Sequence, residues 1–320
     1  MRVFAQSAAA GCLAAIVAMS GIATAQTKDP AAVLTAAREA LGGEKRLSAV
    51  KSFTATGRTR QVRGDNLVPI EFEILVELPD KYLRKDEIPA QESGPTASGF
   101  NGEEWLQDPP PAAAPTPSPA PAGPAGPPPN PAAARVTTLK QDFARLTLGM
   151  FAASFSAYPL TFTYVAEAEA PQGKADVLDA KGPNNFTIRL FINKETHLPI
   201  MVSWTPPAPA GRGPGRGPAP APPGAPGVPP AGRGAPPAGV PPAAMPPVVP
   251  SPAGERARPA PPAPVENRLY FADYRDVDGM QFPFRLRRAV GADTIEETAF
   301  DRFKVNPKID PRKFDVRKPQ

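Results

Sequence analysis

The chain is poor in the residues that carry thiol and imidazole chemistry. Its 320 residues include one Cys, Cys12, and one His, His197. A serine-type triad would have to use His197, which lies in a predicted polar turn before Leu198-Pro199. A zinc site would need several Cys or His ligands that the sequence lacks. We therefore expect no catalytic residue, no metal site, no cofactor and no enzymatic activity.

The chain also lacks a strong excess of one charge where a folded domain could use it. Lys and Arg number 36 against 31 Asp and Glu. The surplus comes from Arg2 and from the segment 205–264, which holds five Arg and one Glu; the remainder has 30 residues of each sign. Nucleic-acid-binding domains present a basic folded face. We expect no nucleic-acid partner.

Long apolar runs are missing except near the N-terminus. Met1-Arg2 precedes an apolar stretch that is densest over residues 12–19, and Ala23-Thr24-Ala25 follows. This order is typical of a Sec-type signal peptide, and the stretch is shorter than the about 20 strongly apolar residues that span a membrane. We predict a signal peptide at 1–25, cleaved between Ala25 and Gln26. Cleavage would remove Cys12 and leave a periplasmic, disulfide-free protein.

Proline, in contrast, is abundant and concentrated. Of the 48 Pro, 35 lie in residues 109–134 and 205–264, which otherwise consist mainly of Ala and Gly. Such segments lack the apolar mass to offset chain entropy, and proline removes backbone donors. We predict two disordered insertions at these ranges. They divide one domain into three parts, at 26–108, 135–204 and 265–320.

Two helices are predicted from caps and periodicity. The first covers 30–50, with Asp29 as its N-cap, Pro30 in its first turn and a break at Gly42-Gly43. The second covers about 136–157. Its apolar residues form one stripe at helical spacing, widened by Phe151 and Phe155; the stripe comprises Leu139, Phe143, Leu146 and Met150.

The remaining segments alternate between apolar and polar residues, the pattern of half-buried strands. Asp278-Gly279 is a strong hairpin signal. Helices do not alternate with strands, so an antiparallel sheet is favoured over a parallel one. We predict about eleven strands, at 52–62, 71–78, 81–88, 99–107, 160–164, 174–180, 185–193, 198–204, 267–276, 280–290 and 293–305.

Several stretches resemble the periplasmic LolA/LolB-like proteins, also called outer-membrane lipoprotein-sorting proteins. The resemblance is carried by ALGGEKRLSAVKSFTATGR (40–58), FNGEEWLQD (100–108), INKETHLPIMVSW (192–204), YFADYRDVDGMQFPFRLR (270–287) and AFDRFKVNPKIDPRKFDV (299–316). It implies a mainly β, α+β fold: a curved, incompletely closed antiparallel β-barrel with helices on its concave side. Family members hold lipoprotein acyl chains, other lipids or hydrophobic peptides there. The two Pro-rich insertions depart from the family pattern.

We therefore predict a non-enzymatic periplasmic binding protein whose second helix covers a cavity for a hydrophobic ligand. Flexible and aromatic side chains suit a lining that accepts varied chains. The candidate lining residues are Leu139, Phe143, Leu146, Met150 and Phe151 on the helix and Phe72, Ile74, Val76, Phe162, Tyr164, Phe186, Ile188, Phe282 and Phe284 on strands.

Two other functions stay open. One is an envelope interaction or sensor scaffold that binds peptides or cell-wall partners through the Pro-rich segments. The other, less favoured, is a carboxylate hydrolase. The expected partners are a lipid or an acylated protein or peptide, and an envelope protein. We expect peripheral membrane contact at most, and a monomer.

Overall fold

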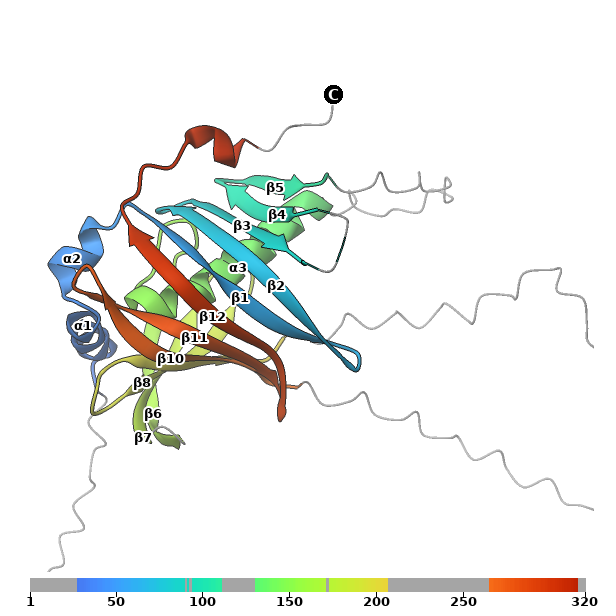
Figure 1. The fold of residues 1–320 in the computed structure, drawn as a ribbon. Coiled ribbons are helices and arrows are strands. Elements are labelled where there is room, and N and C mark those ends of the chain that lie inside the picture. Colours follow the sequence, from blue (N-terminus) through green and yellow to red (C-terminus); the bar gives the residue numbers. More distant parts are fainter. Residues whose placement is uncertain are drawn as a thin grey trace, which may run out of the picture.

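A computed structural model describes residues 28–89, 91, 94–110, 130–170, 173–206 and 265–315 (Figure 1). The predicted signal peptide, with its cleavage site at Ala25 and Gln26, lies outside the described residues. So do most of the two segments predicted to be disordered insertions.

In the described residues, twelve antiparallel strands form one continuous sheet. In chain order they are β1 (Ser52–Arg63), β2 (Asn66–Glu77), β3 (Lys81–Glu87), β4 (Thr96–Asn101), β5 (Glu104–Asp108), β6 (Thr161–Ala170), β7 (Gly173–Lys181), β8 (Thr187–Asn193), β9 (Pro199–Trp204), β10 (Asn267–Val277), β11 (Met280–Val290) and β12 (Asp293–Val305). The spatial order is β5-β4-β3-β2-β1-β12-β11-β10-β9-β8-β7-β6.

This order makes the sheet two meanders joined at one place. Every hydrogen-bonded neighbour is also the next strand in the sequence, except where β1 pairs with β12. The edges are β5 and β6, and the helix α3 (Pro131–Phe151) links them in the sequence. A helix that connects the two edges must cross the sheet, and α3 lies across its concave face (Figure 1). The predicted fold, an open antiparallel barrel with helices on its concave side, is confirmed.

The predicted strand count is too low by one. The run 99–107, predicted as a single strand, is a hairpin of β4 and β5 that turns at Gly102-Glu103. Gly102 has φ +59°, a conformation that glycine adopts without a steric penalty. The Asp278-Gly279 hairpin is confirmed: both residues have positive φ, at +56° and +79°.

The second helix is shifted from its predicted range of 136–157. It begins at Pro131, where the Asn130 side chain caps the backbone N–H of Ala132. It ends at Phe151 because Ala152 is left-handed, with φ +46°. The chain then turns back, and the Phe155 ring packs edge-on against Phe151, with centroids 5.6 Å apart. Phe155 therefore widens the apolar surface from a loop and not from the helix.

The first predicted helix divides at the predicted break. Asp29 caps α1 (Pro30–Ala40), and Gly42 and Gly43 separate it from α2 (Glu44–Ala49). The joint lies against the β10–β11 turn: Gln281 N–H donates to the carbonyl of Leu41 at 2.9 Å. A Cβ at Gly42 would lie 2.6 Å from the Gly279 carbonyl oxygen. The pair α1–α2 thus covers one end of the curved sheet (Figure 1).

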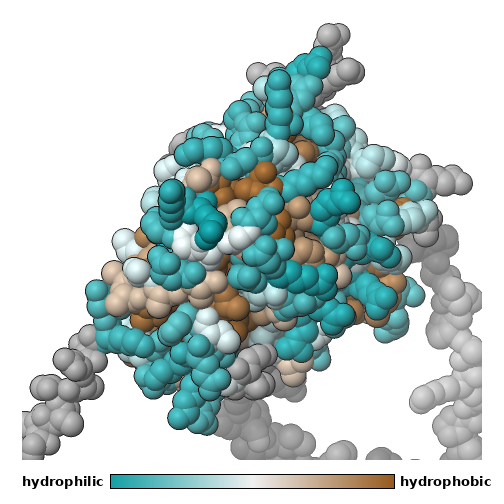
Figure 2. All heavy atoms as spheres, turned by 60° about the vertical axis from the view of Figure 1, so that its left-hand side comes forward, coloured by the Kyte–Doolittle hydropathy of each residue, from teal (hydrophilic) through white to brown (hydrophobic). Residues whose placement is uncertain are grey.

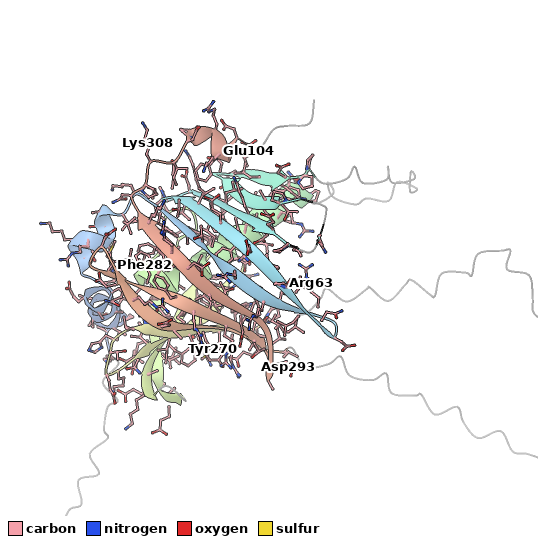
Figure 3. The ribbon with its side chains drawn as sticks, viewed as in Figure 1. Arg63, Glu104, Tyr270, Phe282, Asp293 and Lys308 are labelled. Atoms are coloured by element: carbon pink, nitrogen blue, oxygen red, sulfur yellow. The ribbon has the colours of Figure 1, made fainter. Side chains whose placement is uncertain are left out.

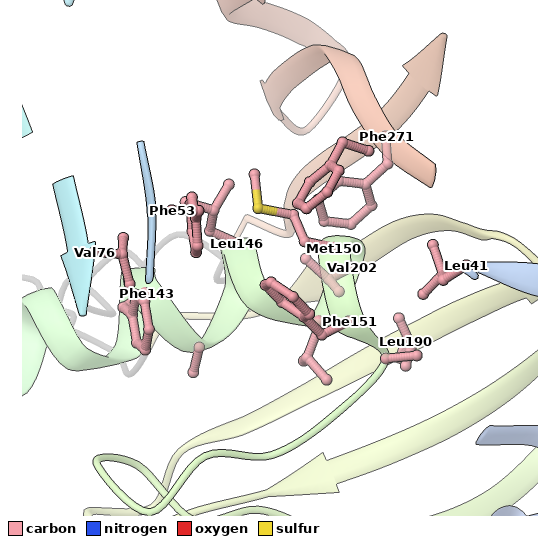
Figure 4. Close-up of a cluster of buried hydrophobic side chains, with 14 of the residues drawn as sticks. Leu41, Phe53, Val76, Phe143, Leu146, Met150, Phe151, Leu190, Val202 and Phe271 are labelled. Carbon is pink, nitrogen blue, oxygen red and sulfur yellow. The ribbon is translucent and has the colours of Figure 1, made fainter. Parts of the chain in front are cut away.

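The core lies between α3 and the concave face. The C-terminal half of α3 is buried on all sides, from Phe143 to Phe151. Phe151 packs on Phe53 of β1 and Phe282 of β11, with centroids 5.9 Å apart in both pairs. Figure 4 shows Met150 and Phe151 among side chains from both meanders of the sheet. One helix therefore ties the β1–β5 and β6–β12 meanders together.

The outer face of the sheet is mainly polar, with a small second core. Leu75 of β2 and Leu83 of β3 are covered there by Ile309 and Phe314 of the C-terminal segment, which forms a 3₁₀ turn at Pro311–Phe314. Figure 2 shows one side of the molecule, where polar residues predominate and apolar patches are small and separate.

Gly149 marks the closest approach of α3 to the sheet. A Cβ at this position would lie 2.1 Å from a ring carbon of Phe271 on β10. The hydroxyl of Tyr274 is 2.8 Å from the carbonyl oxygens of both Gly149 and Pro199, and it can donate to one at a time. Burial raises the pKa of Tyr274 well above its usual value. Because Phe271 lies so close, α3 needs a residue without a side chain at position 149.

We predict that Gly149→Ala lowers the free energy of unfolding by about 1–3 kcal/mol through overpacking. In an unhindered helix the same change would stabilise by about 1 kcal/mol. Denaturant unfolding measures the difference. Thr138→Ala on the exposed side of α3 is the control and should change stability by about 0.5 kcal/mol or less. Adding Phe271→Leu should recover part of the loss; a neutral Gly149→Ala would contradict the close packing.

Candidate functional site

A cavity of about 230 Å³ lies between the middle of α3 and the concave face. Its walls come from both meanders and from the helix, so no single segment forms it. The lining residues are Ile74, Tyr82, Arg84, Asp86, Ser98, Leu139, Asp142, Arg145, Leu146, Trp204, Leu269, Leu286, Arg288, Glu296, Thr298 and Phe300.

The inward-facing side chains change from apolar to charged along the strands. At the α1–α2 end, where Figure 3 labels Phe282, they are apolar; toward the β11–β12 turn, where it labels Asp293, they are polar. In that direction β3 presents Tyr82, Arg84 and Asp86; β11 presents Phe282, Phe284, Leu286 and Arg288; and β12 presents Phe303, Phe300, Thr298 and Glu296. The cavity occupies the transition, so one wall is apolar and the other charged.

A chain of hydrogen bonds crosses the floor of the cavity from β3 to β12. Arg84 Nη2 donates to Thr59 Oγ1 at 3.2 Å, and Thr59 and Thr298 share a hydrogen bond of 2.9 Å. Thr298 Oγ1 in turn lies 3.5 Å from Glu296 Oε1. Arg84 also pairs with Asp86 at 2.7 Å. These partners satisfy a polar row in an otherwise apolar interior, which fixes its geometry.

On the wall formed by α3, β9 and β11, two arginines, Arg145 and Arg288, lie against the ring of Trp204. The guanidinium carbon of Arg145 lies 4.3 Å from the Trp204 ring centroid, and that of Arg288 lies 5.6 Å from it. Arg145 also lies over Phe186 at 4.9 Å and pairs with Asp142 at 2.7 Å. Cation–π contacts of this kind hold a guanidinium in place without using its hydrogen-bond donors.

The structure divides the fourteen predicted lining residues into three groups. Three line the cavity: Ile74, Leu139 and Leu146. Nine are buried in the main core: Phe72, Val76, Phe143, Met150, Phe151, Phe186, Ile188, Phe282 and Phe284. Phe162 and Tyr164 on β6 are partly buried and pack against that core. The residues belong to one interior, but most of them lie in the core and do not line the cavity.

The charged lining residues were absent from the sequence hypothesis, although a signal for some of them exists. Phe282, Phe284 and Leu286 alternate inward, and the same period of two places Arg288 inside. On β9 the same period of two places Trp204 on the inner face together with Val202. Arg145 gives no such signal, because the helix around it is buried on every side.

Two other hollows lie outside the barrel, at about 570 and 510 Å³. Both are lined mainly by side chains of the outer face, including Arg58, Glu71, Glu73 and Arg287. Both are larger than the inner cavity, and the second also has Tyr270, Phe271 and Leu286 in its lining. The helix α3 contributes no residue to either hollow, so neither lies between the helix and the sheet.

Other features bear on the hypotheses from sequence. His197 is an exposed turn residue with φ +58°. Within the described ranges, no group of three or more His, Cys, Asp and Glu side chains is arranged to hold a metal ion. No helix in this part of the chain has both the length and the apolar character needed to cross a membrane.

Comparison with known proteins gives structural similarity only. No family model matches the sequence, and no curated protein matches it. A LolA superfamily protein from Nitrosomonas europaea aligns over 90% of this chain and 97% of its own, with 12% identity and a TM-score of 0.47. An outer membrane lipoprotein-sorting protein domain from Vibrio parahaemolyticus aligns over 88% and 95%, with 8% identity and a TM-score of 0.43.

A DUF1329 family protein from Desulfovibrio piger aligns over 91% of this chain and 100% of its own, with 9% identity and a TM-score of 0.43. These three structures are similar to the chain at 12% identity or less. The similarity concerns the course of the chain and assigns no ligand.

Tyr82, in the cavity wall, gives the interior a measurable pH dependence. Burial raises its pKa to about 12, against a smaller opposing effect of Arg84. The folded protein therefore holds this proton more tightly than the unfolded chain, whose tyrosine pKa is about 10. The stabilising effect is complete below pH about 10 and is lost as the pH rises toward 12.

We predict that the free energy of unfolding falls by about 2 kcal/mol between pH 10 and 12 through Tyr82 alone. Tyr82→Phe should reduce this fall while keeping the ring contacts with Phe100 and Phe143. Urea unfolding at pH 8, 10 and 11.5 measures it, with tyrosinate absorbance as a second readout. Equal alkaline sensitivity in the two proteins would show that Tyr82 titrates normally.

Proposed function

We propose that this chain is an exported, periplasmic, non-enzymatic binding protein. It holds a lipid, an acyl chain or another hydrophobic ligand in the cavity between α3 and the concave face. The cavity itself carries the proposal, since it joins apolar side chains of α3, β2, β10 and β11 around one space inside the open barrel. The predicted signal peptide supplies the location.

The N-terminal half of α3 is the part that can yield to a larger ligand. The cavity is smaller than the about 300–1,000 Å³ of most ligand sites. Residues Pro131–Gln141 are mostly exposed or half-buried, whereas the helix from Phe143 onward is buried. Lys140 fastens this half to the β4–β5 turn by an ion pair with Glu103 at 2.5 Å. A ligand with a longer acyl chain would enlarge the cavity by displacing the N-terminal half of α3.

Affinity would come mainly from the apolar area removed from water. The gain is about 25 cal/mol per Å², less the cost of ordering ligand and side chains. No bond is made or broken, and no cofactor takes part. The Pro-rich segments that would support an interaction scaffold lie mostly outside the described residues, so no observation favours that alternative.

We predict that the mature protein, purified gently from the periplasm, carries a stoichiometric hydrophobic ligand. Native mass spectrometry followed by organic extraction should detect it and identify its class. The denatured mass should match a chain that begins at Gln26. A ligand-free mass that persists after incubation with total envelope lipid would contradict the binding proposal. A mass that retains residues 1–25 would contradict export with cleavage.

A bulky substitution in the cavity should abolish binding without unfolding the protein. Leu139 lines the cavity but is only half-buried, so Leu139→Trp can fill the space at small cost to stability. We predict loss of the bound ligand in the same mass measurement. Leu67→Trp is the matched control, because Leu67 is 62% exposed and outside the cavity. Equal ligand content in both variants would place the ligand elsewhere.

A further inference from the structure

Three arginines line the cavity from three different elements: Arg84 on β3, Arg145 on α3 and Arg288 on β11. Three carboxylates accompany them, from Asp86, Asp142 and Glu296. The formal charges cancel, so any preference for an ion must come from local contacts. Those contacts differ sharply among the three arginines.

Arg84 is fully engaged by the protein. Its Nε donates to Asp86 at 2.7 Å, its Nη2 donates to Thr59, and its guanidinium lies 4.7 Å from the Phe72 ring centroid. Burial lowers the pKa of Arg84, but Asp86 and Tyr82 more than offset this, so the net shift is upward. This arginine belongs to the structural row on the floor of the cavity.

Arg145 and Arg288 keep donors without partners. Arg145 is 8% exposed and pairs with Asp142 through Nη1, yet its Nε is buried with no acceptor. The Nε of Arg288 is likewise buried with no acceptor, and the ion pairs among the described residues do not include this side chain. A buried donor without an acceptor costs about 1–3 kcal/mol.

The two guanidinium groups also repel each other. Both lie against Trp204, which holds them on one wall of the cavity. Burial lowers the pKa of Arg145; Asp142 only partly offsets this, and the charge of Arg288 adds to the lowering. Glu296 is the cross-strand neighbour of Arg288, but its hydrogen bonds go to Gln61 and Thr298. An anion beside Trp204 would relieve both the repulsion and the missing hydrogen bonds.

We infer that the ligand is an amphiphile with an anionic oxygen head group, a carboxylate or a phosphate, bound by Arg145 and Arg288. The inference rests on the proposed function and names the chemistry of its ligand. A guanidinium can donate two parallel hydrogen bonds to paired oxygens of a carboxylate or a phosphate. Leu139, Leu146 and Leu286 line the same cavity and would contact the first carbons of the alkyl chain of the ligand. This apolar wall favours an amphiphile over a free anion.

Calorimetry of the delipidated mature protein with four probes tests this inference. The probes are dodecanoate, dodecyl phosphate, dodecanol and inorganic phosphate. At least one of the two anionic amphiphiles should bind more tightly than dodecanol, by about tenfold or more, because hydrogen bonds to charged groups contribute about 1.5–3 kcal/mol. Inorganic phosphate should bind far more weakly than either. Preference for one anionic amphiphile identifies the head group.

Arg288→Gln should weaken binding of the preferred anionic amphiphile by about tenfold or more and leave dodecanol binding nearly unchanged. Arg287→Gln is the matched control, because Arg287 lies on the outer face against Tyr270. Arg288→Lys keeps the charge and should retain part of the preference. Thermal unfolding of each variant separates loss of affinity from loss of structure, and Arg145→Gln repeats the test if Arg288→Gln fails to fold.

Three results would overturn the inference. The first is equal affinity for dodecanol and the anionic amphiphiles, and the second is an anionic affinity that neither Arg288→Gln nor Arg145→Gln changes; both leave the proposed function standing. The third is inorganic phosphate that binds as tightly as dodecyl phosphate, because the alkyl chain would then contribute nothing. If no amphiphile binds at all, the proposed function fails and the inference fails with it.

Discussion

The packing of α3 into the concave face is the contact on which the rest of the structure depends. The sheet has two free edges, β5 and β6, and the helix is the segment of chain that runs from one to the other. Its residues from Phe143 to Phe151 are buried. Beside the middle of the helix, where Leu139, Arg145 and Leu146 border it, a space remains open, and this space is the cavity. Closure of the core and the existence of a binding site therefore follow from one helix that fills the barrel incompletely.

The position of this helix along the strands also decides the character of the cavity. The C-terminal end of α3 meets the apolar rows of β1 and β11, where Phe53 and Phe282 pack against Phe151. The middle of the helix faces the rows where Arg84, Thr298 and Arg288 replace them. Polar groups inside a fold are tolerated when they have hydrogen-bond partners. Arg84, Thr59 and Thr298 have such partners. Arg145 and Arg288, next to Trp204, have them only in part.

Much of the fold could be predicted because it rests on short-range patterns. Alternation gave the strands, Asp29 and Pro30 gave the start of α1, and Asp278-Gly279 gave the hairpin. The errors have local causes as well. The left-handed Ala152 ends α3 with no marker residue, and the Gly102 turn is too short to interrupt the hydrophobic pattern of 99–107.

The candidate site was harder to predict, because the helical stripe identifies what is buried and not what remains open. Phe143, Met150 and Leu146 share one stripe, yet only Leu146 borders the cavity. What separates them is which part of the sheet lies opposite each side chain, and that is a tertiary property. Its consequence is a site defined less by apolar residues, which any core supplies, than by two arginines held inside with donors unused.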